Sequence, residues 1–326
     1  MNNAAITGRR APRIPTTTGW GLGLAFGAAM ISGLAIYLNG FAVKQLPDAA
    51  LFTTLKNAVA AAILLVPALV LARRTPAPRP IPIRGRLGLV VVGVVGGSIP
   101  FILFFSGLAI ASAPAAAFIQ KTLFVWVAIL AVPFLGERLG AGQLAALVVL
   151  VVGQALVLPP SGIAWGRGET LIFIATVLWA VETILVKRLL GSIASPTVAA
   201  ARMGIGLVVL VGYLAVAGKL GTVAGLSQVQ WAWALLSGLI LAAYVGTWFA
   251  ALSRAPASAV TSVLVVGAVV TGLLSTIAKG VAPEPSSVGG YVLIAAAAAV
   301  FAAWTLRTQR RAVTVAATAT TSTASG

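Results

Sequence analysis

The sequence predicts an all-α polytopic membrane protein: ten transmembrane helices in two inverted five-helix repeats, with both termini cytoplasmic. Apolar runs of about twenty residues recur along the chain, and each can cross about 30 Å of hydrocarbon as a helix. Only 8% of the residues are charged, against about 25% in a typical soluble domain. The basic residues cluster between the apolar runs, which is how membrane proteins fix their orientation.

Proline, glycine or charged residues separate the apolar segments and set the limits of the expected helices. We expect spans at 18–40, 49–72, 87–110, 113–135, 140–158, 169–190, 196–217, 230–252, 256–279 and 288–306. They form a first repeat at 18–158 and a second at 169–306, joined by a periplasmic or extracellular linker at 159–168. A cytoplasmic tail at 1–17 precedes them, and the small polar residues of the cytoplasmic tail at 307–326 are expected to be disordered.

The distribution of basic residues predicts the orientation. Fifteen of the 22 lysines and arginines fall on the side of the N-terminus, four on the other side, and three inside spans. This bias places both termini in the cytoplasm. The first apolar run continues past twenty residues without a small-residue cleavage site, so we interpret it as a span and not as a signal peptide.

The residue inventory narrows the function. Cysteine and histidine are absent and only five acidic residues occur, so thiol, imidazole and multi-carboxylate sites have no candidates. We therefore expect no enzyme, no metal and no cofactor. The net charge is +17, and most of the basic residues lie in short clusters between the spans. We therefore expect the protein to have a lipid bilayer and not nucleic acid as its partner. The phosphate-binding pattern GxxxxGK[ST] does not occur, which argues against direct use of ATP.

The two halves of the chain resemble each other. The segment AVKQLPDAALFTTLKNAVAAAILL (42–65) parallels LVKRLLGSIASPTVAAARMGIGLVVL (185–210), which places Lys56 opposite Arg202. Likewise SGLAIASAPAAAFI (106–119) parallels WFAALSRAPASAVT (248–261). Because each half has an odd number of spans, the second half is inverted. Inverted repeats are typical of secondary transporters, whose substrates bind near the midplane between the halves.

These segments also resemble the EamA-type ten-helix exporters of the drug/metabolite transporter superfamily. The resemblance rests on SGLAIASAPAAAFI leading into FLGERL (134–139), and on AALSRAPASAV (250–260) in the second half. Two departures occur: AKGVAPEP (278–285) stands where the family repeats Gly-Glu, and the fourth span lacks the family's mid-span proline. The resemblance implies a small-metabolite transporter, often an exporter of amino acids or related compounds.

Four charged residues fall inside the expected spans. A charge at the centre of a span costs at least about 2.5–3.5 kcal/mol, so we expect each of the four to have a partner or a function. Glu182 and Arg202 lie ten residues either side of the turn between spans six and seven, so they are expected at similar depth. They form either a structural ion pair or a coupling or gating pair that rearranges during transport.

The first half repeats this geometry with different chemistry. Asn39 stands at the place of Glu182, and Lys56 at the place of Arg202. The two residues lie at similar depth and can meet, but Asn39 cannot neutralise Lys56, so we expect the lysine stem instead to carry its ammonium outward toward the surface. Asn39 is also a candidate for substrate contact.

Lys121 is the remaining charge within a span. It lies about seven residues past Pro114, roughly 10 Å below the outer surface, and its counterpart in the repeat is Val263. Three interpretations remain open: contact with an anionic substrate group, an ammonium that reaches the surface, and a structural partner such as a backbone carbonyl. Gln120 beside it adds a donor and an acceptor.

Aromatic residues are the other candidates for substrate contact. Trp179 lies one turn before Glu182 on the same face, and Phe101, Tyr244 and Trp248 belong to the equivalent third and eighth spans. They form either an apolar wall for a substrate or ordinary packing.

We therefore expect a secondary transporter of the inner (plasma) membrane that moves a small polar metabolite by alternating access, as an exporter. Its substrate is expected to be anionic or zwitterionic, an amino acid or related carboxylate. The alternatives are a drug, nucleotide-sugar or lipid-intermediate transporter of the same fold and, less favoured, a channel. Dimerisation stays open.

Overall fold

The computed structural model describes residues 16–74, 80–108, 110–111, 113–157, 165–280 and 282–322. Within those residues every regular element is a helix. Most of the expected N-terminal tail and of the expected linker lies outside the described residues.

Two series of helices make up the described chain. The first half contains α1 (Thr16–Gln45), α2 (Ala49–Arg74), α3 (Ile83–Gly97), α4 (Ile99–Leu108), α5 (Ala113–Lys121), α6 (Leu123–Leu135) and α7 (Ala141–Val157). The second half contains α8 (Arg167–Leu189), α9 (Ser195–Val216), the 3₁₀ helix η1 (Leu220–Gly225), α10 (Gln228–Leu252), α11 (Ala257–Leu264), α12 (Val266–Lys279) and α13 (Pro285–Ser322). Among the described residues, nine helical stretches are long and apolar enough to cross a membrane, and α7 is a shorter apolar helix. Together they correspond to the ten expected spans.

Three spans are interrupted near their middle. The third span breaks at Ser98, two residues before Pro100, as expected of a proline that cannot donate a backbone hydrogen bond. The fourth span breaks at Thr122 and the ninth at Val265, where no proline stands. In the repeat register these two breaks differ by one residue, so the halves share the feature.

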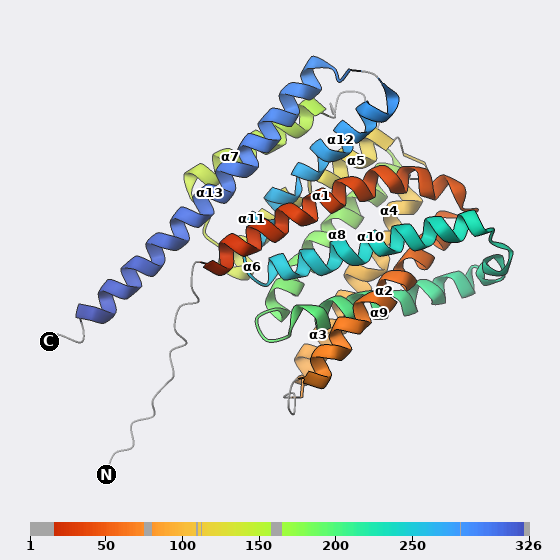
Figure 1. Cartoon of the computed structure of the whole chain (residues 1–326), viewed down its shortest axis with the longest axis horizontal. Coiled ribbons are helices and arrows are strands. Elements are labelled where there is room, and N and C mark those ends of the chain that lie inside the picture. The colour runs from red at the N-terminus through yellow and green to blue at the C-terminus, as the bar shows by residue number, and fades with distance from the viewer. Residues whose placement is uncertain are drawn as a thin grey trace, which may run out of the picture.

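Equivalent helices of the two halves make equivalent packing contacts. Helices α2 and α9, which are equivalent, pack against each other, and so do α7 and α13. Helix α1 packs on α10, while its counterpart α8 packs on α3 and α4. Figure 1 shows α7 and α13 side by side at one edge of the bundle and α2 beside α9 at another. This arrangement fits the predicted inverted repeat.

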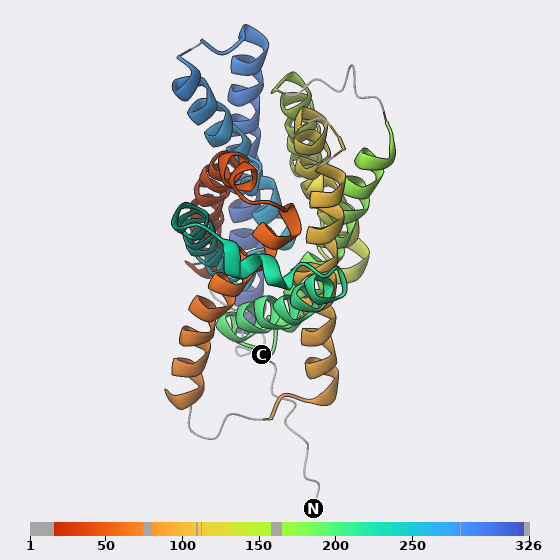
Figure 2. The ribbon, with the colours of Figure 1, turned by 90° about the vertical axis from the view of Figure 1, so that its right-hand side faces the viewer.

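The two ends of the bundle differ in charge. We call "basic face" the end where α1 begins and α2, α6 and α8 end, and "opposite face" the end where α1 ends and α10 begins. In Figure 2 the end of α1 and the beginning of α10, both on the opposite face, point toward the viewer. The last turns of α2 and α8 contribute Arg73, Arg74, Lys187 and Arg188 to the basic face.

Helix α13 differs from the expectation. The tail after residue 306 is expected to be disordered, whereas α13 continues to Ser322 and is 38 residues long, about 57 Å at 1.5 Å per residue. It therefore extends well beyond a bilayer about 30 Å thick. The extension contains alanine and arginine, which favour helix, but threonine is its commonest residue, so helix propensity does not explain the difference.

Candidate functional site

The break in the third span creates a free acceptor inside the bundle. Pro100 has no N–H, so the carbonyl oxygen of Gly96, four residues earlier, has no helical partner. Two side chains of the other half take it: Trp179 Nε1 donates to it over 3.2 Å, and Arg202 Nη2 over 3.0 Å. The kink thus binds α8 and α9 to the first half.

The ion pair expected between Glu182 and Arg202 is formed beside this carbonyl. Arg202 Nε lies 2.5 Å from Glu182 Oε1, and Arg202 Nη2 lies 3.3 Å from Oε2. Both residues are buried, with 5% and 7% of their surface exposed. The two helices meet here across α3, where Gly96 leaves room for Glu182, because a Cβ at Gly96 would collide with its carboxylate.

Rings surround the pair. Phe101 lies 5.3 Å from Trp179, centroid to centroid in an edge-to-face arrangement, and 5.8 Å from the Arg202 guanidinium. Tyr244 and Trp248 stack on each other with their ring centroids 6.1 Å apart. The structure thus brings two of the predicted aromatic residues, Phe101 and Trp179, to the ion pair, while Tyr244 and Trp248 contact each other.

Lys56 does not reach the surface as expected. Only 3% of its surface is exposed, and its ammonium lies 4.8 Å from the ring centroid of Phe105, 5.0 Å from that of Phe52 and 5.5 Å from that of Phe101. Such distances are typical of cation–π contacts. Aromatic rings contact the ammonium inside the bundle, which is why the expectation of an outward ammonium is wrong. In the part of the chain that the structure describes, no hydrogen bond or ion pair joins this ammonium.

The remaining candidates stand apart from the cluster. Lys121 is the last residue of α5, next to the break at Thr122, and it is half-buried like Gln120. Asn39 is half-buried near the end of α1. No side-chain hydrogen bond, ion pair or ring contact links these three residues to the cluster within the described ranges.

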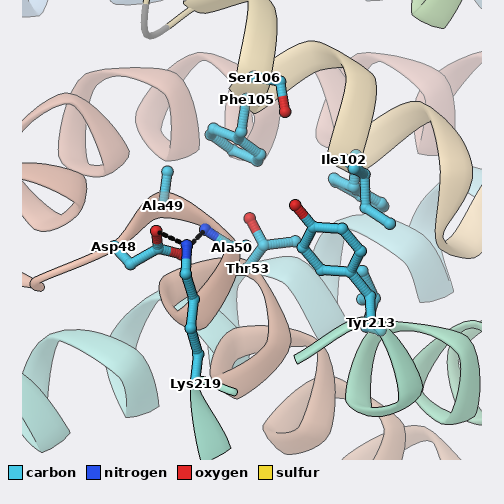
Figure 3. Close-up of a pocket in the computed structure, with 11 residues that line it drawn as sticks. Asp48, Ala49, Ala50, Thr53, Ile102, Phe105, Ser106, Tyr213 and Lys219 are labelled. Atoms are coloured by element: carbon cyan, nitrogen blue, oxygen red, sulfur yellow. Dashed lines mark hydrogen bonds and ion pairs between the residues drawn. The ribbon is translucent and has the colours of Figure 1, made fainter. Parts of the chain in front are cut away.

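A pocket of about 180 Å³ opens at the opposite face between α2, α4 and α9. Figure 3 shows the hydroxyl groups of Thr53, Ser106 and Tyr213 pointing into it. An ion pair lines its rim: Lys219 Nζ lies 2.6 Å from Asp48 Oδ2. Asp48 also caps α2 by accepting from the backbone amides of Ala50 and Leu51 at 2.8 and 3.1 Å. Sequence reasoning missed this pair because its partners are 171 residues apart.

The rim ion pair is expected to persist across the physiological pH range. Burial raises the pKa of Asp48, but the hydrogen bond from Lys219 and those from Leu51 and Ala50 leave it below the ordinary 3.8. The hydrogen bond to Asp48 raises the pKa of Lys219 above the ordinary 10.5. The ion pair therefore contributes its full stabilisation at pH values between the ordinary pKa values of Asp48 and Lys219, 3.8 and 10.5. It is lost as pH falls through the lowered pKa of Asp48, or rises through the raised pKa of Lys219.

Unfolding midpoints measured from pH 3 to pH 9 test this prediction. The difference between the wild type and Asp48→Asn should stay constant from about pH 5 to pH 9 and shrink below about pH 4. A difference that changes near pH 7 would contradict it.

A second hollow, of about 630 Å³, lies at the basic face. There Glu137 accepts from the backbone amides of Ala257 and Ser258 at 2.6 and 3.1 Å, and from Ser258 Oγ at 2.5 Å. It therefore caps α11 of the other half.

Two basic residues of α8 reinforce this closure. The Lys187 ammonium donates to the carbonyls of Leu252 and Ala255 at 2.5 and 2.6 Å. Arg188 donates from Nε and Nη2 to the Phe134 carbonyl at 3.1 and 2.6 Å. We call Glu137, Lys187 and Arg188, with these acceptors and donors, the basic-face latch, because they join the ends of α6, α8 and α10 to the start of α11.

A kinked helical bundle of two inverted halves, with buried charges between them, defines a membrane transporter of the inverted-repeat class. The comparisons with known proteins agree. The model of the EamA-like transporter family matches the chain twice, at residues 19–158 and 166–303, and the chain belongs to that family. The two matches coincide with the two halves.

No curated protein sequence matches the chain. Among solved structures, one described as "Crystal structure of protein" resembles it with a TM-score of 0.71 and 18% sequence identity. The similarity covers 86% of this chain and 97% of the other, and it supports the fold alone. The chain is thus a multi-pass membrane protein of the EamA-like family.

Proposed function

We propose that this protein is a secondary transporter that exports a small polar metabolite with an anionic group, such as an amino acid or related carboxylate, across the inner membrane. The basic face would be cytoplasmic, as the distribution of lysine and arginine predicts. The two halves would alternate in opening to either side.

The observation that carries the substrate class is the charge balance inside the spans. Arg202 is neutralised by Glu182, whereas Lys56 and Lys121 have no acidic partner among the described residues. A buried cation without a partner is costly, and an anionic substrate would offset that cost during transport. We assign to Lys121, with Gln120 beside it, a contact with the anionic group, and to the aromatic residues around Trp179 a contact with the rest of the substrate.

The aromatic cluster also favours a second candidate, a transporter of a larger and more apolar cargo such as a drug, a nucleotide sugar or a lipid intermediate. Phe101, Phe104 and Trp179 form a continuous ring surface, with Trp179 5.3 and 5.5 Å from the other two. For such a cargo the rings would be essential and Lys121 dispensable.

Substrate counterflow in proteoliposomes separates the two candidates. The wild type should exchange a carboxylate-bearing solute from a panel of amino acids and organic anions. Lys121→Met should lower the exchange about tenfold or more, because a charge-assisted hydrogen bond contributes about 1.5–3 kcal/mol.

The matched control is Lys44→Met, which removes an exposed cation at the end of α1 and should leave exchange unchanged. Normal exchange by Lys121→Met would refute the assigned contact. A wild type that exchanges only apolar cargo would favour the second candidate.

A further inference from the structure

Lys56 and Arg202 occupy equivalent places in the two halves. Lys56 stands seven residues after the first residue of α2, and Arg202 seven after the first residue of α9. The carbonyl of each lies against a glycine of the other half: that of Arg202 against Gly97 of α3, and that of Lys56 against Gly238 of α10. The structure therefore supports the register in which Lys56 is the counterpart of Arg202.

The residues at the place of Glu182 differ between the two halves. Glu182 stands seven residues before the end of α8, and Asn39 six residues before the end of α1. The second half thus has a carboxylate where the first half has an amide. Arg202 is neutralised within its own half, and Lys56 is not.

A second polar group beside Lys56 also has no partner. The hydroxyl of Thr53, three residues earlier on α2, is buried with 1% of the residue exposed, and no hydrogen bond satisfies it. Thr53 lines the opposite-face pocket, and Figure 3 shows its oxygen directed into that space. Phe101 and Phe105 belong to the same lining and hold the Lys56 ammonium on their rings. Two lining residues of the pocket thus contact the Lys56 ammonium, which lies behind the lining.

We propose that Lys56 and Thr53 form an anion-binding subsite, reached from the opposite-face pocket, in which a carboxylate takes the role that Glu182 has in the other half. An ammonium and a hydroxyl are both donors, so they suit a carboxylate and leave its two oxygens satisfied. The rings around the ammonium exclude water, which strengthens the attraction. This subsite rests on the proposed function for its role in transport, and it is distinct from the contact assigned to Lys121.

Thermal unfolding of the purified protein in detergent tests the subsite, with acetate as the probe. At about 100 mM, sodium acetate should raise the midpoint of the wild type by about 2 °C over sodium chloride, as expected for a ligand of about 10 mM affinity. Lys56→Met should abolish the acetate shift. Thr53→Val should reduce it, since the hydroxyl is lost and the shape is kept.

Two further variants keep the test decisive. Asn39→Glu retains Lys56 and supplies an internal carboxylate at the place of Glu182, so the acetate shift should disappear although the lysine is intact. Lys44→Met, which removes an exposed cation at the end of α1, should retain the full shift. A wild type without a shift, or a shift that survives in both Lys56→Met and Asn39→Glu, would overturn the subsite. Counterflow judges the proposed function separately, because acetate binding in detergent requires no transport.

Discussion

Glu182→Gln is expected to destabilise the protein by about 3–5 kcal/mol, because it leaves the Arg202 guanidinium buried without a counter-charge. Glutamine keeps the shape of glutamate, so the space beside Gly96 stays filled and the loss reports the charge. Chemical unfolding in detergent, followed by circular dichroism, measures the effect.

The chain provides its own control in the rim ion pair. Asp48 and Lys219 have 30% and 40% of their side chains exposed, so Asp48→Asn should cost no more than about 1 kcal/mol. The double variant Glu182→Gln with Arg202→Met should recover part of the stability, since it removes the orphaned charge. If Glu182→Gln is as mild as Asp48→Asn, the buried pair contributes little to stability, and a rearranging role in transport gains support.

Most of the fold could be predicted from the sequence, because the bilayer makes hydropathy and charge strong signals. The ten spans follow from these signals, and the repeat follows from the similarity between segments of the two halves. The breaks at Thr122 and Val265 could not be predicted, since neither has a proline nearby to remove a backbone donor. At Thr122 the helix tightens instead: its hydroxyl and its amide both donate to the Ile119 carbonyl, at 2.7 and 3.1 Å.

Within the candidate site, the sequence predicted the contacts that depend only on the depth of a residue in the membrane. It did not predict the contacts that depend on how distant helices pack. Glu182 and Arg202 could be matched because helix rise gives the depth of each. The fate of Lys56 depended on Phe101 and Phe105, which come from another helix. The acceptor at Gly96 follows from Pro100, but the residues that use it come from the other half, and no local pattern identifies them.

Glu137→Ala is expected to open the basic-face latch. The carboxylate accepts three hydrogen bonds at the start of α11, and loss of a cap costs up to about 2 kcal/mol. A change of about 1.4 kcal/mol, within this range, raises the population of the open state about tenfold. Because the protein has no cysteine, a single introduced thiol can report the opening without further substitutions.

Ser262→Cys is a suitable reporter, since Ser262 is fully buried on α11, four residues beyond the capped Ser258, and cysteine has nearly the same shape. A membrane-impermeant maleimide applied from the basic face should label it about tenfold faster in Glu137→Ala than with Glu137 present. The matched control is Glu284→Ala, which removes an exposed acid at the opposite face and should not change the rate.

Equal rates in the two variants would mean that Lys187 and Arg188 keep the basic face closed on their own. A faster rate only with Glu137→Ala would mean that an acid of one half controls access through a helix of the other. The second half has AKGVAPEP in place of the corresponding Gly-Glu, so the opposite face would then open more readily than the basic face.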